Sequence, residues 1–194
     1  MKKIALITGA TSGIGKATAS LLAKNNFNII ITGRRNNLLE GLKNEVEKKY
    51  DSEVLILNFD IRNNKEVVNA VNNIPSGWKN IEVLVNNAGL AAGLNPLQSG
   101  ELDNWERMID TNVKGLLYIS RLIAPLMIKN GKGHIVNIGS IAGKEVYAKG
   151  NVYCASKYAV EAISKGMRID MLEQNIILCR QLFWDGALRG SLPD

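Results

Sequence analysis

The sequence contains few of the residues that build disulfide frameworks and zinc sites. It has two cysteines, Cys154 and Cys179, and one histidine, His134, among 194 residues. Two cysteines cannot form a disulfide framework, and these three residues do not provide the four ligands of a structural zinc site. We therefore expect no bound metal. We expect His134 to be a packing residue, because it lies at the opposite end of its strand from the polar residues discussed below.

Long apolar runs and basic runs are also missing. No apolar run reaches the roughly 18 residues of a membrane span. The apolar start "MKKIALITGATSGIG" is too short for a signal peptide and leads into glycines. The net charge is +6, but the lysines are scattered, which disfavours nucleic-acid binding and fits a phosphate-rich small ligand or simple solubility. We expect a cytoplasmic protein that binds neither membrane nor nucleic acid.

The sequence does contain an alternation of strand and helix patterns, with a composition that is 46% hydrophobic and 22% charged. Strands rich in Val, Ile and Leu on both faces, separated by helices, predict a doubly wound, Rossmann-like parallel sheet in a single α/β domain over residues 1–194. The predicted strands are 3–9, 27–33, 53–60, 81–87, 133–140 and 175–183. The predicted helices are 13–25, 36–50, 64–74, a long helical region over 101–130 with a break or kink near Asp110, and 151–173.

A glycine-rich loop joins the first predicted strand to the first predicted helix. In "TGATSGIG", Gly9 permits a tight turn, Gly13 permits close approach of backbone to a pyrophosphate, and Gly15 permits close packing of the helix. The free N–H groups of the helix N-terminus favour phosphate binding. The alternative is a glycine-rich turn without a ligand. The predicted dinucleotide contacts are Gly9, Ala10, Thr11, Ser12, Gly13, Ile14 and Gly15.

Two arginines follow the second predicted strand, in "TGRR". An acidic residue at this position would bind the ribose 2′-hydroxyl of NAD, whereas Arg34 and Arg35 suit the 2′-phosphate of NADP. The alternative is a solvated arginine pair in a loop. We expect NADP to bind in preference to NAD.

The stretch "YCASK" places Tyr153 and Lys157 four residues apart. On a helix these residues are neighbours on one face. Because chance also produces such pairs, this spacing does not by itself establish a site.

Taken together, these motifs resemble those of the classical short-chain dehydrogenase/reductases, including the wide glycine spacing that is the family's own form. The finer resemblance is to the branch that oxidises serine, L-allo-threonine and related small 3-hydroxy acids with NADP. The residues in which the resemblance lies are Thr8, Gly9, Gly13, Gly15, the run Asn86-Asn87-Ala88-Gly89, Asn112, Ser140, Tyr153 and Lys157.

The resemblance implies a role for each matching residue. Asp60 and Ile61 would contact adenine, and Asn87 would line the cofactor cleft. Asn112, Ser140, Tyr153 and Lys157 would form a catalytic tetrad, with Ser140 and Tyr153 on the substrate and Tyr153 and Lys157 also on the cofactor. From the residues alone, Asn112 could instead be structural in a kinked helix, and Ser140 could be a turn residue at a strand end.

The implied chemistry is hydride transfer by the nicotinamide, while one residue of the protein carries the accompanying proton. A tyrosine has an ordinary pKa of about 10. A nearby Lys157 ammonium would therefore be needed to lower the pKa of the Tyr153 phenol towards about 7. The predicted function is an NADP-dependent oxidoreductase for a small hydroxy acid or related alcohol. The alternatives are reduction of another carbonyl, such as a 3-oxoacyl thioester or a sugar, and a non-catalytic cofactor-binding remnant.

The family pattern also includes C-terminal segments that this sequence does not match. Family members continue with a Pro-Gly turn, a mobile substrate loop and a seventh strand, whereas this sequence ends "CRQLFWDGALRGSLPD". We expect a domain truncated after about the sixth strand, with NADP binding and weak turnover. A truncation, a frameshift and a genuine variant all remain open. The resemblance further implies a homodimer or homotetramer through the helices around 115–128 and 158–172.

Overall fold

The computed structural model describes residues 2–182. Six strands form one sheet in the order β3-β2-β1-β4-β5-β6, and every neighbouring pair is parallel. This confirms the predicted doubly wound parallel sheet. The strands are β1 (Lys3–Ile7), β2 (Phe27–Gly33), β3 (Val54–Asn58), β4 (Ile81–Asn86), β5 (Gly133–Ile138) and β6 (Ile176–Gln181).

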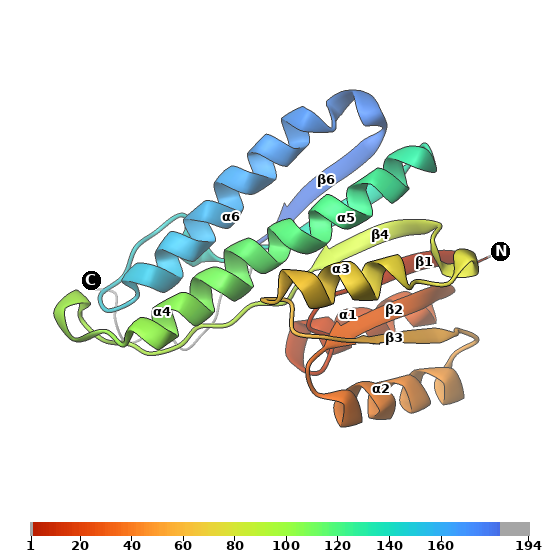
Figure 1. Cartoon of the computed structure of the whole chain (residues 1–194), viewed down its shortest axis with the longest axis horizontal. Coiled ribbons are helices and arrows are strands. Elements are labelled where there is room, and N and C mark those ends of the chain that lie inside the picture. Colours follow the sequence, from red (N-terminus) through yellow and green to blue (C-terminus); the bar gives the residue numbers. More distant parts are fainter. Residues whose placement is uncertain (1, 183–194) are drawn as a thin grey trace.

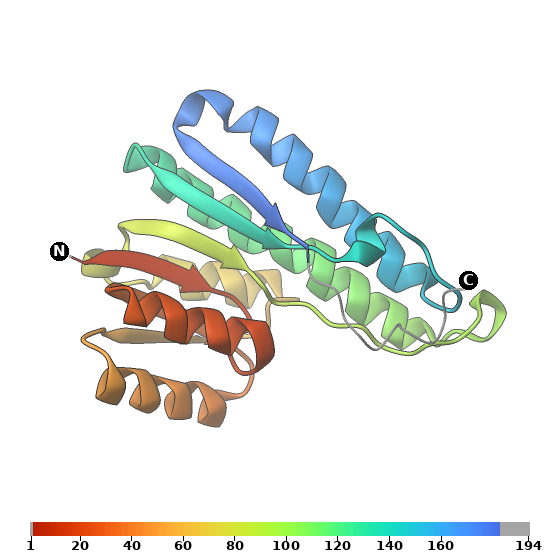
Figure 2. The ribbon, with the colours of Figure 1, turned by 180° about the vertical axis from the view of Figure 1, so that it is seen from behind.

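Helices cover both faces of the sheet (Figures 1 and 2). Helices α1 and α2 pack on one face. Helices α3, α5 and α6 pack on the other face, where α4 leads into α5. Within the described residues, no helix is long and apolar enough to cross a membrane. The helices are α1 (Gly13–Lys24), α2 (Asn36–Lys49), α3 (Asn64–Asn72), α4 (Leu102–Ile109), α5 (Leu116–Lys129) and α6 (Asn151–Asp170).

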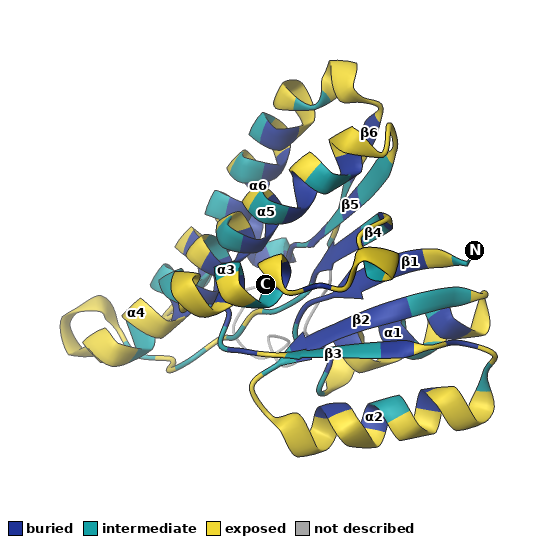
Figure 3. Ribbon diagram, turned by 45° about the vertical axis from the view of Figure 1, so that its right-hand side comes forward, coloured by how far each residue is buried: buried dark blue, intermediate teal, exposed yellow. Residues whose placement is uncertain are grey.

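The central strands are buried on both faces (Figure 3). Ala5, Leu6 and Ile7 of β1 are each 0% exposed, which explains why this strand is apolar throughout instead of alternating. Leu6 belongs to the core under α3, α5 and α6, while Ala5 and Ile7 belong to the core under α1 and α2. The sheet is thus a rigid platform whose carboxyl edge presents the loops that follow each strand.

The predicted ends of the elements differ from the observed ends mainly at the carboxyl ends of the strands. The strands expected over 3–9 and 53–60 end earlier, at Ile7 and Asn58. The helix expected to reach 173 ends at Asp170 and is followed by a short 3₁₀ turn. The end of the strand expected over 175–183, together with the atypical terminal residues, falls partly on 183–194, which lie outside the described residues.

The long helical region does not break near Asp110. It widens into a π-helical segment over Asp110–Gly115, and α5 continues directly from it (Figure 1). The irregularity is therefore where the sequence predicted a break or kink, and it takes the form of a π-helical segment. Such wide turns occur frequently at functional sites, and this one contains Asn112.

Candidate functional site

A cleft of about 730 Å³ lies along the carboxyl ends of the strands. This is the place where open α/β sheets bind their ligands. Twelve of the predicted site residues line it: Gly9, Thr11, Ser12, Ile14, Arg34, Arg35, Asp60, Ile61, Asn87, Ser140, Tyr153 and Lys157. Ala10, Gly13, Gly15 and Asn112 do not line it, although each belongs to a segment that does.

Backbone geometry explains the glycines of the loop. Gly9 and Gly13 have φ values of +65° and +54°, in the left-handed region that favours glycine. A Cβ on Gly15 would lie 2.4 Å from the carbonyl oxygen of Gly9 and 2.4 Å from Nδ2 of Asn87. Gly15 therefore permits the helix to approach the loop and the Asn87 side chain.

Thr8 anchors the loop to the end of β4, a role that sequence reasoning did not assign to it. Its hydroxyl accepts hydrogen bonds from the backbone N–H groups of Asn87 and Ala88, both at 3.0 Å, and donates to the carbonyl of Val85 at 3.3 Å. Nδ2 of Asn87 donates to the carbonyls of Thr8 and Gly9 at 2.8 and 3.1 Å. These bonds fix the glycine loop in place. Thr8 already stood in the quoted motif, which was the available signal.

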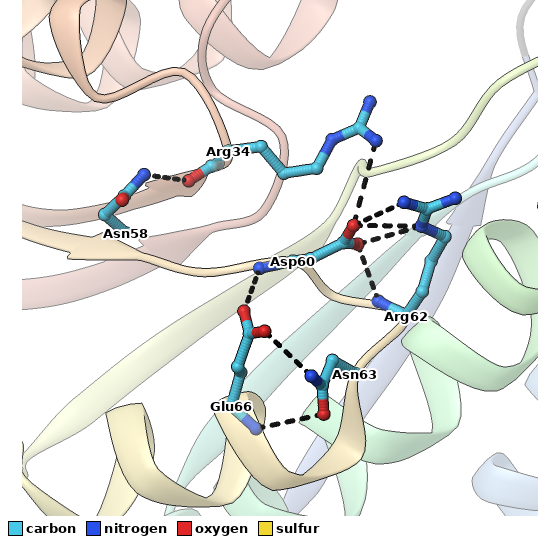
Figure 4. Close-up of polar contacts among 7 residues, drawn as sticks. Arg34, Asn58, Asp60, Arg62, Asn63 and Glu66 are labelled. Atoms are coloured by element: carbon cyan, nitrogen blue, oxygen red, sulfur yellow. Dashed lines mark hydrogen bonds and ion pairs between the residues drawn. The ribbon is translucent and has the colours of Figure 1, made fainter.

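The two arginines extend to different partners. Nη2 of Arg35 donates to the hydroxyls of Thr11 and Ser12 at 2.6 and 3.3 Å, so Arg35 lies against the glycine loop. Nη1 of Arg34 lies 3.8 Å from Oδ2 of Asp60 (Figure 4). Both guanidinium groups thus border the same end of the cleft, one from each side.

Asp60 is held by a residue that the sequence analysis did not select. Nε of Arg62 lies 3.0 Å from both carboxylate oxygens, and Nη2 lies 2.6 Å from Oδ2 (Figure 4). Burial raises the pKa of Asp60, but the hydrogen bonds and charge of Arg62, with the charge of Arg34, outweigh this and hold the pKa below its ordinary value. Asp60 is therefore a carboxylate at neutral pH.

A capping arrangement at the start of α3 positions the backbone of Asp60. Asn63 Oδ1 accepts from the N–H groups of Lys65 and Glu66, and Asn63 Nδ2 donates to Glu66 Oε1 at 2.7 Å. The second oxygen of Glu66 accepts from the Asp60 N–H at 2.8 Å (Figure 4). The spacing of Asn63 and Glu66 is that of a capping box, which was the sequence signal for this support.

Tyr153 and Lys157 lie one turn apart on α6. Nζ of Lys157 is 5.9 Å from the centre of the Tyr153 ring and donates to the carbonyl of Ile138 at 3.1 Å. Lys157 is only 8% exposed, and this burial lowers the pKa of its ammonium to about 8. The pair faces the cleft opposite the glycine loop, as the helical spacing predicted.

Ser140 lies two residues after the end of β5, is buried and lines the cleft. Its hydroxyl oxygen accepts from the N–H of Ala142 at 3.2 Å, which caps a short 3₁₀ turn over Ile141–Gly143. The oxygen retains a proton that can be donated into the cleft. Ser140 is thus both the turn residue that the sequence allowed and a possible hydrogen-bond donor to a ligand.

The side chain of Asn112 is fully engaged inside the protein. It accepts from the N–H of Leu90 at 2.8 Å and donates to the Leu90 carbonyl at 2.9 Å and to Ser156 Oγ at 3.0 Å. It therefore joins the π-helical segment to the loop after β4 and to α6. This geometry supports a positioning role for the side chain, and the catalytic assignment of Asn112 stays a prediction.

A buried polar chain under the cleft was also missed from the sequence. Asn86 donates to Ser120 at 2.9 Å and to Asn137 at 2.8 Å, and Asn137 donates to Ser164 at 2.9 Å. These bonds join β4 and β5 to α5 and α6. By contrast, His134 contacts Cys179 of β6 at 3.1 Å, at the strand end away from the cleft.

A doubly wound sheet with a glycine loop at its first turn defines a Rossmann-like nucleotide-binding fold. Residues 3–180 match the short chain dehydrogenase family. The chain therefore belongs to the short-chain dehydrogenase family, as its motifs suggested.

Several known proteins are similar to this chain. The NADP-dependent 3-hydroxy acid dehydrogenase YdfG of Salmonella typhi is 44% identical over 168 residues, which are 87% of this chain and 66% of the relative. An NADP-dependent 3-hydroxy acid dehydrogenase of Schizosaccharomyces pombe is 38% identical over 90% of this chain and 68% of its own. The chain thus spans about two thirds of the length of these relatives.

The fold is shared with solved structures of the family. A closed form of serine dehydrogenase complexed with NADP+ superposes with a TM-score of 0.87 at 39% identity, over 93% of this chain and 71% of that one. Serine dehydrogenase from Escherichia coli gives a TM-score of 0.83 at 39% identity, over 93% of this chain and 80% of that one.

Proposed function

We propose that this protein is an NADP-dependent oxidoreductase that transfers a hydride between the nicotinamide and a small 3-hydroxy acid or a related alcohol. The observation that supports this most strongly is that one cleft brings together the glycine loop, Arg34, Arg35, Tyr153 and Lys157. The names of the relatives and of the NADP-bound neighbour support the same cofactor and substrate class.

The residues present fit a dinucleotide phosphate. The side chain of Ser12 does not cap α1, so the N–H groups of the first turn can bind a pyrophosphate. A Cβ on Gly13 would meet nothing within 4 Å, which marks open space beside the loop. Arg34 and Arg35 would pair with a 2′-phosphate, while Asp60 would accept a hydrogen bond from the adenine amino group.

The protein's own residues would manage the proton. The cofactor supplies the hydride chemistry once it is bound. Tyr153 would take the proton of the substrate hydroxyl during oxidation or return it during reduction. The Lys157 ammonium, which its pKa of about 8 keeps mostly charged at pH 7, would favour the phenolate by electrostatic attraction. Ser140 would donate to the substrate oxygen.

The direct test is an assay of the 194-residue chain with NADP and either serine or 3-hydroxypropionate. Formation of NADPH with these acids, and not with a sugar or a 3-hydroxyacyl thioester, would support the proposal. NADP binding without turnover of any of these substrates would instead support a protein that binds the cofactor without catalysis.

We also propose that the protein self-associates through α5 and α6. Each helix presents large apolar residues to solvent on the face turned away from the sheet: Leu117 is 43% exposed, Tyr158 42% and Ile169 75%. Large apolar residues left exposed on these two helices favour an interface, and a two-fold dimer or a tetramer of such dimers would cover them.

A further inference from the structure

A small hollow adjoins the cleft at Tyr153. Its volume is about 10 Å³, which is close to the minimum that holds one water-sized group. Tyr153 lines both spaces. The walls of the hollow come from the loop after β4, the start of α4 and the segment 149–153. A substrate whose hydroxyl meets Tyr153 would therefore extend its next polar group towards this hollow.

The charges around the cleft are divided between its two ends. Arg34 and Arg35 lie beside Asp60 and the glycine loop, and Lys157 donates to the carbonyl of Ile138. Among the described residues, Lys149 is the only cation that lines the hollow beside Tyr153. It is exposed, so its long flexible stem can bring the ammonium to a ligand.

The hollow also contains one carboxylate, that of Glu101. Its Oε2 accepts from Nδ2 of Asn104 at 2.7 Å, so Asn104 already provides it with a hydrogen-bond donor. Lys149 has a φ of +66°, where an ordinary side chain is strained and glycine is favoured. Non-glycine residues in this conformation cluster at functional sites. A long cationic side chain at a strained position beside Tyr153 therefore suggests a role for the cation itself.

We propose that Lys149 is a specificity-determining residue that binds the carboxylate of the substrate while Tyr153 contacts its hydroxyl. This rests on the proposed function, which already names small 3-hydroxy acids as substrates, and adds the residue that binds their acid group. An ammonium can pair with a carboxylate but gives no comparable attraction to a neutral alcohol.

The test compares an acid with its neutral counterpart. Lys149→Gly suits the backbone at this position, because glycine adopts a positive φ freely. Lys149→Arg keeps the charge. Asn26→Gly is a matched control, because Asn26 has nearly the same φ of +65° but lies between α1 and β2, away from the cleft. The substrates are 3-hydroxypropionate and 1,3-propanediol, each with saturating NADP.

We expect Lys149→Gly to raise the KM for 3-hydroxypropionate by about twofold to fivefold, with the KM for propanediol and the Kd for NADP unchanged. Lys149→Arg should retain most of the acid affinity, and Asn26→Gly should change neither substrate. Equal changes for acid and diol, or no change for the acid, would overturn the proposal.

Calorimetric titration of 3-hydroxypropionate into the NADP-loaded protein separates this inference from the proposed function. Acid binding that Lys149→Gly weakens, in a protein that turns over neither substrate, would support Lys149 while removing the oxidoreductase function. If the NADP-loaded wild type binds the acid no better than the diol, the role of Lys149 is refuted whatever the turnover.

Discussion

At the scale of single residues, the proposed chemistry depends on Tyr153 and on Lys157, whose ammonium is buried. The sequence predicted Tyr153 and Lys157 as helical neighbours, and the structure places both on the cleft. The sequence could not predict that Lys157 would be only 8% exposed, with its ammonium donating a hydrogen bond to the carbonyl of Ile138. That burial depends on how α6 packs against the end of β5, which is a tertiary property.

Tyr153→Phe tests the proton carrier. The variant keeps the aromatic ring but removes the hydroxyl, so we expect kcat to fall by at least about 10²-fold while the Kd for NADP changes little. Stopped-flow kinetics and calorimetry measure the two quantities on the same preparation. A variant with near-normal kcat would remove Tyr153 from the mechanism.

Lys157→Met tests the energetic cost of the buried ammonium. Burial lowers the Lys157 pKa from 10.5 to about 8, so between these values the unfolded chain holds a proton that the folded protein has lost. The free energy of unfolding therefore rises with pH between about 8 and 10.5. Below about pH 8 the buried Lys157 ammonium lowers the free energy of unfolding by its full amount. At 1.36 kcal/mol per pH unit, we expect the variant to be more stable than wild type at pH 7 by up to about 3 kcal/mol.

Urea unfolding at pH 7 and pH 10 measures this difference, which should shrink at the higher pH. Lys48→Met is the control, because Lys48 is exposed in the last turn of α2 and should change stability little at either pH. A destabilised Lys157→Met protein at pH 7 would show that the hydrogen bond to Ile138 outweighs the cost of burial.

At the scale of elements, the alternation of apolar runs and amphipathic segments was sufficient to place every strand and the main helices. The glycine loop was recognised because it lies between β1 and α1. The sequence could not show that Gly15 would crowd Asn87, a residue far along the chain, nor that the helical region at Asp110 would widen instead of breaking. Arg62 was missed because its hydrogen bonds to Asp60 depend on the turn that precedes α3.

Two glycine substitutions separate the roles of the loop. In Gly15→Ala the Cβ would lie 2.4 Å from the Gly9 oxygen, so we expect a loss of about 1–3 kcal/mol in unfolding free energy together with weaker NADP binding. In Gly13→Ala the space is open but φ is +54°, which predicts a smaller loss of about 1 kcal/mol. Urea unfolding measures both.

Gly41→Ala is the matched control for these variants. Gly41 lies inside α2 with nothing within 4 Å of its Cβ, so alanine should stabilise the protein by about 0.5–1 kcal/mol and leave NADP binding unchanged. If Gly15→Ala behaved like Gly41→Ala, the close contact between the loop, the helix and Asn87 would not exist in solution.

At the scale of the whole molecule, the doubly wound sheet followed from the order of the elements, and it brings segments from residue 9 to residue 157 to one cleft. Because each loop follows a parallel strand, all of them emerge at the same edge. Assembly was less accessible to sequence reasoning: amphipathic patterns in the helices around 115–128 and 158–172 suggest apolar surface, but only the packed structure shows which residues remain exposed.

Leu117→Glu tests self-association. Leu117 is 43% exposed on the outer face of α5, and a charge there would be buried unpaired in a dimer. We expect light scattering to show a dimer or tetramer for wild type at micromolar concentration and a smaller species for the variant. Leu21→Glu is the control, because Leu21 is 60% exposed on α1, away from α5 and α6. A monomeric wild type would refute the proposed interface.

Calorimetric titration of the chain with NADP and with NAD tests the proposed cofactor site most directly. We predict that NADP binds at least about tenfold more tightly than NAD, which corresponds to 1.4 kcal/mol, because Arg34 and Arg35 border the position of the 2′-phosphate. Replacing both arginines with alanine should remove this preference and leave NAD affinity nearly unchanged. Equal affinity for the two cofactors in the wild type, or a preference that survives in the double variant, would contradict the assignment.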